Sequence, residues 1–324
     1  MKRRLAQLIS QYLTRIFNVR YSSFTEVNQF ENVRTLTVEA IEANLSESRV
    51  SADNLSSFTL TEEFEDLFFR TLFEEKPDQE FFYYTSLNSI LSILDYKSLQ
   101  LTSIAGMNDK TEVSFADDLL GRTFKDPYNF TRITTFNRRY IMCFTDKKDH
   151  FNQWRLYGGD GNGVCVGFKY KKPKKHDYYV VFGKVIYGDE ILKLITDLIN
   201  DVKRNLRCNF SLRRLHLWKN FLKHKDYEYE AETRLLIYNR TKNGYKELDK
   251  KFKLNFYNIL VPYVTLDLFD DNLPIKITEI TLGPKCPESS LNNAQLKYFL
   301  KEKTAKDNSY KGIKVGLSKI KHYR

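Results

Sequence analysis

The segment of residues 223–238, KHKDYEYEAETRLLIY, combines acidic and aromatic residues in alternation. Acidic residues occupy every second position of its first part: Asp226, Glu228, Glu230 and Glu232. Because successive side chains of a β-strand point to opposite faces, an extended segment would carry these four carboxylates on one face and apolar residues on the other. The chain as a whole has a formal net charge of +11, so a row of acids within it calls for a chemical explanation.

The later part of this charged face is expected to be covered, because Leu236 and Tyr238 continue it beyond Arg234. A covered carboxylate without a partner costs several kcal/mol, and it is retained chiefly where a partner, a metal ion or a reacting group uses it. Glu230 and Glu232 lie nearest to the covered end, so they are the candidate catalytic residues. The alternative is a solvent-exposed row, in which Arg234 relieves modest repulsion and no function is required.

The elements around this segment predict an α+β fold, in which short strands alternate with helices. Strands are expected in FFYYTS, YIMCFT and VCVGF, and short helices in LNSILSILD and DHFNQWRLYG. The glycine-rich GGDGNG follows a helix and precedes a strand. It is therefore predicted to be a flexible turn, because a dinucleotide-binding loop follows a strand and opens a helix.

Three regions are predicted along the chain. Residues 1–75 form a helical N-terminal extension in which Thr61 caps a helix, residues 76–324 form the main domain, and residues 188–223 are a basic helical insertion within it. The 324 residues suffice for one large domain or two smaller ones.

The composition argues against a membrane protein, a secreted protein and a zinc-binding protein. No apolar run approaches the roughly 20 residues of a membrane span, and the basic, amphipathic N-terminus lacks the apolar stretch and cleavage site of a signal peptide. The cysteines form no CxxC pair and the five histidines have no zinc-binding spacing: Cys143, Cys165, Cys208 and Cys286 are expected to be reduced. These features favour a cytoplasmic protein without a membrane partner.

Positive charge is concentrated in residues 201–225 and 301–324, each of which contains eight Lys or Arg residues. The first segment contains a single acid, and the second contains two. Such concentrations favour an acidic partner, a nucleic acid or a phosphate-bearing ligand. The alternative is that both segments are ordinary solvated helix faces.

A set of motifs resembles a large bacterial family of unknown function, DUF2971. In chain order the motifs are FFYYTSLNSILSILDYKSLQLTS, MNDKTE, CFT, WRLYGGDGNGVCVGF, EAETRLL, ITLGP and SKIKHYR. The resemblance covers roughly residues 80–324 and leaves residues 1–75 outside. One departure is in the first strand, where the family usually has His-Tyr-Thr and this chain has Tyr83-Tyr84-Thr85.

This family is in turn similar in plan to ADP-ribosyltransferases, including DNA-modifying toxins. The resemblance implies an ADP-ribosyltransferase-like split β-sheet, NAD as substrate and no metal ion, with a possible role as a toxin or anti-phage effector. It implies Glu232 as the catalytic carboxylate and Glu230 as its support. The cofactor-binding candidates are Tyr83, Tyr84, Thr85, Trp154, Arg155, Tyr157 and Arg234.

Cleavage of the nicotinamide–ribose bond develops positive charge on the ribose, and a nearby carboxylate stabilises that charge. The acceptor of such a reaction is a nucleic acid, a protein or water. Candidate acceptor-binding residues come from the first basic segment and from MNDKTE: Arg213, Arg214, Lys219, Asn108, Asp109 and Glu112.

Two other function classes remain open from the sequence. Carboxylate rows bind Mg²⁺ and basic segments hold phosphate backbones, so a metal-dependent nuclease is one alternative, although Arg234 stands where a nuclease Glu-x-Lys motif would have lysine. A non-enzymatic nucleic-acid-binding module is the other, although its aromatic residues form no recognisable base-stacking platform.

Overall fold

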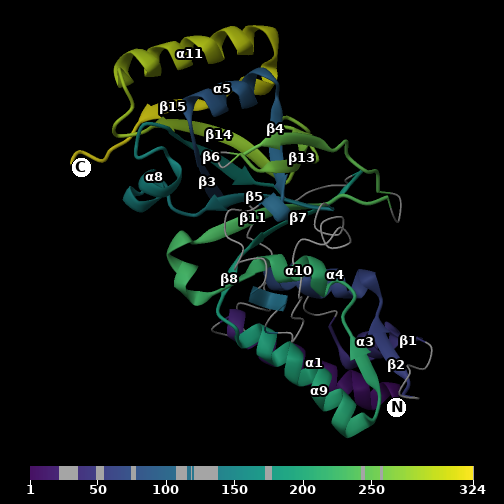
Figure 1. Cartoon of the computed structure of the whole chain (residues 1–324). Coiled ribbons are helices and arrows are strands. Elements are labelled where there is room, and N and C mark those ends of the chain that lie inside the picture. The colour runs from purple at the N-terminus through teal and green to yellow at the C-terminus, as the bar shows by residue number, and fades with distance from the viewer. Residues whose placement is uncertain are drawn as a thin grey trace. The chain divides into compact units, whose positions relative to one another are not determined.

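The chain divides into two units, each with its own helices and strands (Figure 1). A computed structural model describes residues 1–21, 36–48, 55–73, 78–106, 115–117, 119, 138–171, 177–241, 245–255 and 258–323. The first unit draws on residues 1–74, 108–127 and 183–228, and the second on residues 75–107, 128–182 and 229–324. Helices and a mixed sheet together confirm the α+β class. No helix within the described residues is long and apolar enough to cross a membrane.

The first unit contains most of the helices of the N-terminal and basic segments. Its helices are α1 (Lys2–Arg20), α3 (Val38–Ala43), α4 (Glu62–Phe73), α9 (Glu190–Leu206), α10 (Leu215–Trp218) and the 3₁₀ helix η3 (Lys219–Phe221). Two small sheets accompany them. One has the order β1 (Leu45–Ser48), β2 (Ser57–Leu60), β9 (Asn209–Ser211), and the other pairs β8 (Ile186–Tyr187) with β10 (Leu222–Lys223). The strands β1 and β2 are a difference from the all-helical N-terminal extension that the sequence predicts.

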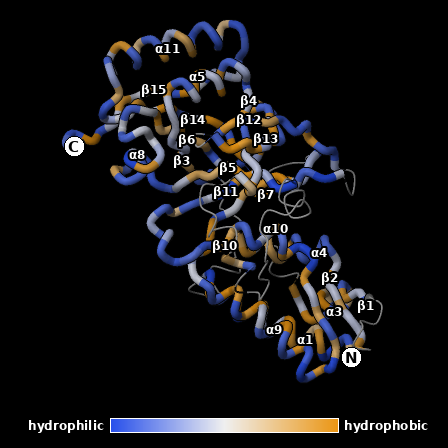
Figure 2. The backbone as a smooth tube through the Cα atoms, in the orientation of Figure 1, coloured by the Kyte–Doolittle hydropathy of each residue, from blue (hydrophilic) through white to orange (hydrophobic). Residues whose placement is uncertain are grey.

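Helices α1 and α9 are amphipathic and contact each other. Apolar residues recur every three or four positions in both, as the alternation of hydrophobic and hydrophilic colour along them shows (Figure 2). The Tyr12 hydroxyl of α1 donates a hydrogen bond to Asp201 of α9 at 2.5 Å. The cap predicted at Thr61 is confirmed, because its hydroxyl accepts a hydrogen bond from the Phe64 amide at 3.3 Å.

The second unit is built on a ten-stranded mixed sheet. Its strands are β3 (Glu80–Thr85), β4 (Ser98–Ser103), β5 (Arg139–Thr145), β6 (Val164–Tyr170), β7 (Tyr179–Lys184), β11 (Glu232–Tyr238), β12 (Lys251–Leu254), β13 (Leu260–Asp267), β14 (Ile275–Leu282) and β15 (Lys314–Leu317). Its helices are α5 (Leu87–Asp95), α8 (Phe151–Tyr157), α11 (Ser289–Lys306) and the short 3₁₀ helices η2 (Ile104–Gly106) and η5 (Asn308–Tyr310). The 3₁₀ helix η4 (Lys225–Glu230) leads into β11.

The sheet branches at β5. The main path is β12-β13-β4-β5-β3-β6-β14-β15, while β11 pairs with β5 and with β7 outside that path. β5 pairs with β11 along its whole length, from Thr145 opposite Glu232 to Arg139 opposite Tyr238. Its pairing with β3 is a single position, where Phe82 lies opposite Thr145. The end of β5, the beginning of β11 and Phe82 of β3 therefore meet at one place.

One face of this sheet carries the main hydrophobic core. Alternate residues of each strand point into it, for example Phe81 of β3, Phe144 of β5 and Leu235 of β11, each at most 3% exposed. Helix α5 packs Ile90 and Leu94 against the same core, as its sequence predicts. The opposite face of β3 carries a smaller cluster of Phe82, Tyr84, Trp154 and Cys165, in which α8 contributes the tryptophan.

Candidate functional site

The acidic row of residues 226–232 is divided between two elements. The 3₁₀ helix η4 ends at Glu230, Ala231 has a positive φ of 48°, and β11 begins only at Glu232. The prediction of one continuous strand is therefore wrong for its first part. The strand pairing ends where Thr145 lies opposite Glu232; the Asp146 amide still donates to the Ala231 carbonyl at 3.2 Å, and the positive φ of Ala231 then turns the chain out of the extended conformation.

This division separates the carboxylates by environment. Asp226 and Glu228 are exposed, whereas Glu230 is 8% exposed and Glu232 is 5% exposed. The expectation that the later part of the row is covered is confirmed, because β11 is buried from Glu232 to Tyr238. The first half of the row behaves as ordinary solvated acid, so the two buried residues are left as the carboxylates to explain.

Glu232 forms a buried ion pair with Arg234. The arginine Nε and NH2 donate hydrogen bonds to Oε1 and Oε2 of Glu232, each at 2.8 Å, and the two side chains are 6% and 3% exposed. Both lie on the same strand face because they are two residues apart. Burial lowers the pKa of the Arg234 guanidinium to about 9, which leaves it protonated at neutral pH. Of the three explanations for a covered carboxylate, a partner, a metal ion or a reacting group, the structure shows a partner for Glu232, which is Arg234.

The same pair bears on the role predicted for Arg234. A guanidinium that binds both oxygens of a neighbouring carboxylate inside the protein is not presented to a pyrophosphate at the surface. The bidentate geometry is typical of an arginine that holds a structural or catalytic carboxylate in one rotamer.

Glu230 has a different setting. Its Oε1 accepts a hydrogen bond at 2.9 Å from the hydroxyl of Tyr157, a residue of α8 whose side chain is 48% exposed. Its backbone carbonyl accepts hydrogen bonds from Thr145 Oγ1 at 2.8 Å and Gln153 Nε2 at 3.3 Å. These bonds tie the turn before β11 to the end of β5 and to α8. They fix the backbone of Glu230, and the Tyr157 hydroxyl binds its side chain.

Two further residues, which the sequence did not single out, lie beside Glu230. Lys147 donates a hydrogen bond from Nζ to the Tyr229 carbonyl at 2.6 Å, and the Tyr229 side chain is 46% exposed. Gln153 was also missed. The signal for it was its place on α8 one helical turn before Tyr157, since residues four apart lie on one helix face.

Tyr83, Tyr84 and Thr85 do not form one cluster. Tyr84 lies on the face of β3 that carries Phe82 and Trp154, and the register Phe82–Thr145–Glu232 makes this the face of Glu232. Tyr83 lies on the opposite face, where its ring is 6.1 Å from that of Phe144, and strand alternation places Thr85 with it. Of the three cofactor-binding candidates, Tyr83 and Thr85 therefore share one face of β3 and Tyr84 lies on the other.

Tyr84 has an evident structural task. Its hydroxyl donates to the Lys147 carbonyl at 2.8 Å and accepts from the His150 amide at 2.9 Å, so it holds the turn between β5 and α8. Burial raises the pKa of this hydroxyl. Its ring packs edge-on against Trp154 at 4.9 Å.

The two aromatic candidates of α8, Trp154 and Tyr157, differ in exposure. Trp154 is fully buried and donates from Nε1 to Asp149 at 2.8 Å, so it belongs to the core and offers no face to a ligand. Tyr157, in contrast, is half-exposed. Arg155 is exposed, and its guanidinium lies 5.9 Å from the centre of the Phe151 ring.

The glycine-rich segment after α8 is a turn, as predicted. Gly159 and Gly161 have positive φ values of 58° and 84°. A Cβ at Gly163 would approach the Thr85 carbonyl oxygen to 2.2 Å, so only glycine fits there. The turn is thus packed closely on the end of β3, and it carries the chain from α8 into β6.

The acceptor-binding candidates of the first unit are largely internal. Arg214 is 7% exposed and its NH2 lies 3.2 Å from Glu62 and 3.3 Å from Asp66. Lys219 is 9% exposed and pairs with Asp117 at 2.5 Å. The prediction that these two cations lie on a phosphate-binding surface is wrong, because both side chains are buried and paired with carboxylates. Arg213 is exposed, whereas Asn108, Asp109 and Glu112 lie outside the described residues.

The turn at residues 213 and 214 is held by Glu65, which has no exposed surface. Its two carboxylate oxygens accept hydrogen bonds from the amides of Arg213 at 2.9 Å and Arg214 at 2.6 Å. Burial raises the pKa of Glu65 to about 7, against the opposing effect of these two amides. The segment is therefore organised around buried carboxylates of α4.

These contacts predict that Arg214→Gln destabilises the protein. It removes the cation shared by Glu62 and Asp66, and we expect a loss of about 2 kcal/mol, between an exposed and a fully buried pair because both carboxylates keep some solvent access. Arg213→Gln is the matched control, since it makes the same change at an exposed neighbour. Thermal unfolding of both variants measures the difference, and equal midpoints for the two would contradict the buried role of Arg214.

Among the residues that the structure describes, no three His, Cys, Asp or Glu side chains come together as a metal site would require. The described ionisable groups around Glu230 are instead Lys147, Tyr157, Tyr229 and the Glu232–Arg234 pair. Beside the Glu232–Arg234 pair, this set offers one carboxylate, Glu230, two half-exposed aromatic residues and one cation, Lys147.

Neither the search of curated proteins nor the search of solved structures found a match for this chain. A family model does match, over residues 153–235, and this segment contains Gln153, Tyr157, Glu230, Glu232 and Arg234. The family is described as a protein of unknown function (DUF2971), so the resemblance drawn from the motifs is confirmed over residues 153–235.

Proposed function

We propose that this protein cleaves the nicotinamide–ribose bond of NAD, as an ADP-ribosyltransferase or an NAD glycohydrolase, and that Glu230 is the carboxylate beside the reacting ribose. The observation that carries the proposal is the 2.9 Å hydrogen bond between the buried Glu230 Oε1 and the hydroxyl of half-exposed Tyr157. It joins a carboxylate, shielded from water, to an aromatic ring that a ligand can reach. A shielded carboxylate stabilises positive charge on a sugar more strongly than an exposed one does.

This proposal exchanges the roles that the sequence suggests for the two glutamates. Both oxygens of Glu232 already accept hydrogen bonds from Arg234, so the guanidinium largely neutralises the charge of this carboxylate. Glu230 meets a hydroxyl whose ring extends to the surface. In this proposal the Glu232–Arg234 pair is a positioning element that fixes the start of β11, and therefore the place of Glu230 two residues earlier.

The residues around Glu230 fit the chemistry of NAD. Tyr157 and Tyr229, which are 48% and 46% exposed, provide flat apolar surfaces for a nicotinamide ring. Lys147 and Arg155 are cations on the same stretch of chain and would pair with the pyrophosphate. When bound, NAD supplies the electrophilic ribose carbon, and the chain supplies the charge, the stacking surface and the exclusion of water.

The sheet supports the ADP-ribosyltransferase-like part of the proposal. A split β-sheet needs a point at which neighbouring strands part, and β5 meets β3 at one position only, next to Glu232. A nucleic-acid acceptor remains part of the proposal as the resemblance implies it, with Arg213 as its exposed candidate.

The test is incubation of the full chain with labelled NAD, alone and with added DNA, RNA or cell lysate. Release of nicotinamide in every case, with label left as free ADP-ribose, supports hydrolysis. Label found on a macromolecule supports transfer and identifies the acceptor class. No nicotinamide release under any of these conditions would refute the proposal.

Removal of divalent metal is expected to leave this activity unchanged. Charge stabilisation by Glu230 requires no bound cation, because the leaving nicotinamide is already a good leaving group in NAD⁺. NAD turnover with excess EDTA should equal turnover without it. A nuclease-like dependence, in which EDTA abolishes activity and Mg²⁺ restores it, would contradict this expectation.

A further inference from the structure

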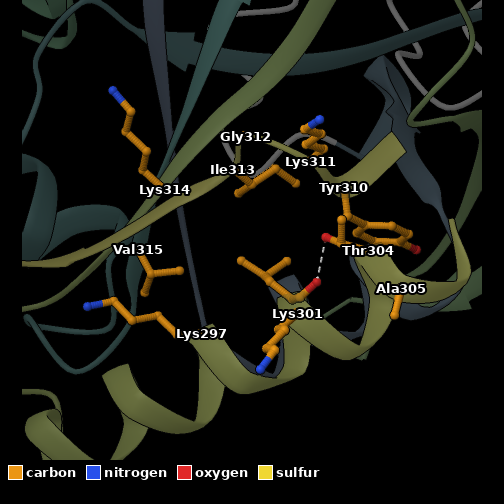
Figure 3. Close-up of a pocket in the computed structure, with 11 residues that line it drawn as sticks. Lys297, Lys301, Thr304, Ala305, Tyr310, Lys311, Gly312, Ile313, Lys314 and Val315 are labelled. Atoms are coloured by element: carbon orange, nitrogen blue, oxygen red, sulfur yellow. Dashed lines mark hydrogen bonds between the residues drawn. The ribbon is translucent and has the colours of Figure 1, made fainter. Parts of the chain in front are cut away.

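A groove of about 730 Å³ lies in the second unit, between α11 and the chain that runs from η5 into β15 (Figure 3). Its charged and apolar lining includes Lys297, Lys301, Lys311, Ile313, Lys314 and Val315. Ile313 and Val315 point toward the centre of the groove in Figure 3, and both pack against the main core at their bases. The groove thus has an apolar floor beneath a rim of lysines.

The lysines of the rim form no ion pair within the described part of the chain, unlike Lys303 on the same helix. Within the described part of the chain, no carboxylate lies within ion-pair distance of Lys297, Lys301, Lys311 or Lys314. Lys303, on the same helix but outside the groove, pairs with Asp95 at 2.6 Å. Four cations around one groove, with no internal counter-charge, favour a negatively charged occupant.

The groove also follows an open sheet edge. β15 stands at the end of the strand order and, among the strands that the structure describes, pairs with β14 alone, in parallel. The Ser318 amide donates to the Leu282 carbonyl at 2.8 Å, so the amides of even-numbered residues face β14 and those of Val315 and Leu317 face outward. Lys314 and Val315 point to opposite faces, yet both line the groove, which therefore runs along the edge of the strand.

An open edge beside a helix is a template for one more strand. The outward amide and carbonyl groups of β15 would bind the backbone of an extended peptide, while side pockets select its side chains. Because the side chains of such a peptide alternate, its acidic residues would face Lys314 and the residues between them would cover Ile313 and Val315 on the opposite face.

We propose that this groove binds an extended acidic peptide, which adds to β15 as an edge strand. A nucleic acid fits less well, because the aromatic residue of the lining, Tyr310, is 2% exposed and its hydroxyl donates to the Leu94 carbonyl at 2.6 Å. It therefore offers no face for a base to stack on. The proposal is independent of NAD chemistry and stands or falls separately from it.

Fluorescence anisotropy with labelled peptides tests the groove directly. The probe is a peptide of roughly eight residues that alternates Glu and Val, the length of an ordinary strand. One control peptide has the same composition with its Glu residues in a block. A second has proline at alternate positions, which removes the backbone amides that a strand needs. The full chain should bind the alternating peptide most tightly and the proline peptide weakly or not at all.

Variants of the chain locate the binding. Lys301→Gln combined with Lys314→Gln should weaken the alternating peptide about tenfold, or roughly 1.4 kcal/mol. Lys306→Gln is the matched control, since Lys306 is exposed on α11 but outside the groove lining. The affinity of this variant for the alternating peptide should equal that of the unaltered chain. Val315→Pro removes an outward amide and should abolish binding, whereas Val315→Ala retains the amide and should lower affinity only modestly.

Several outcomes would overturn the proposal. No binding of the alternating peptide at low salt is one, and equal binding of the block or proline peptides is another, because either would show attraction by charge without strand addition. Equal affinity for a labelled single-stranded DNA, with the same loss in the lysine variant, would assign the groove to nucleic acid. Should Val315→Pro unfold the chain, the proline peptide on the unaltered protein decides the same question.

Discussion

Glu230→Gln should reduce NAD turnover by about a hundredfold or more and leave the thermal midpoint nearly unchanged. The loss follows from removal of the negative charge that stabilises the developing charge on ribose, since deleting one preorganised electrostatic group typically costs a factor of about 10²–10³. The fold should survive because glutamine keeps an oxygen that can accept the hydrogen bond from Tyr157. Nicotinamide release at saturating NAD measures the effect.

Two controls separate charge from structure in this experiment. Tyr157→Phe keeps the ring and removes the hydroxyl, so we expect a loss of about tenfold at most, in line with a single hydrogen bond. Glu228→Gln changes an exposed acid of the same row and should have no effect. Full turnover in Glu230→Gln would remove Glu230 from the chemistry. If the unaltered chain fails to release nicotinamide, the proposed function is refuted as a whole.

Glu232→Gln should destabilise the protein by about 3–5 kcal/mol, the usual result of breaking a buried ion pair by removing one partner. The variant withdraws the negative charge from two 2.8 Å hydrogen bonds to a guanidinium whose side chain is 3% exposed. Chemical denaturation of the variant and the unaltered chain measures the loss. The effect should exceed that of Arg214→Gln, whose carboxylate partners keep more solvent access.

A double variant tests whether the pair is the cause. Glu232→Gln combined with Arg234→Met removes both charges and places a side chain of similar length at the arginine position. Because replacing a buried pair costs less than breaking it, the double variant should recover part of the stability lost by Glu232→Gln alone. A native midpoint for Glu232→Gln together with lost NAD turnover would instead return the catalytic role to Glu232.

The local sequence pattern was sufficient to predict those helices, strands and turns whose spacing of apolar and turn-forming residues lies within the element itself. The short helix at 151–157, the glycine turn after it, the strand at 164–170 and the cap at Thr61 all follow from nearest-neighbour spacing and turn chemistry. The alternation in residues 232–238 also predicted a strand with a covered charged face. Each of these signals acts over a few residues, so a sequence contains it in full.

Only the tertiary structure decided what each charge contacts. Of the acidic row, only Glu232 belongs to β11, which begins opposite the last residue of β5, Thr145. Nothing within residues 226–232 specifies where that distant strand ends. Arg214 and Lys219 resemble surface cations in sequence, yet Glu62, Asp66 and Asp117 bind them from elements about 100 or more residues away. Tyr83 and Tyr84 are neighbours in the chain but face opposite sides of the sheet. The spacing of apolar residues is a local property of a chain. The burial of a side chain and the partner of a charge depend on which distant segments pack beside it, and those contacts form only in the folded state.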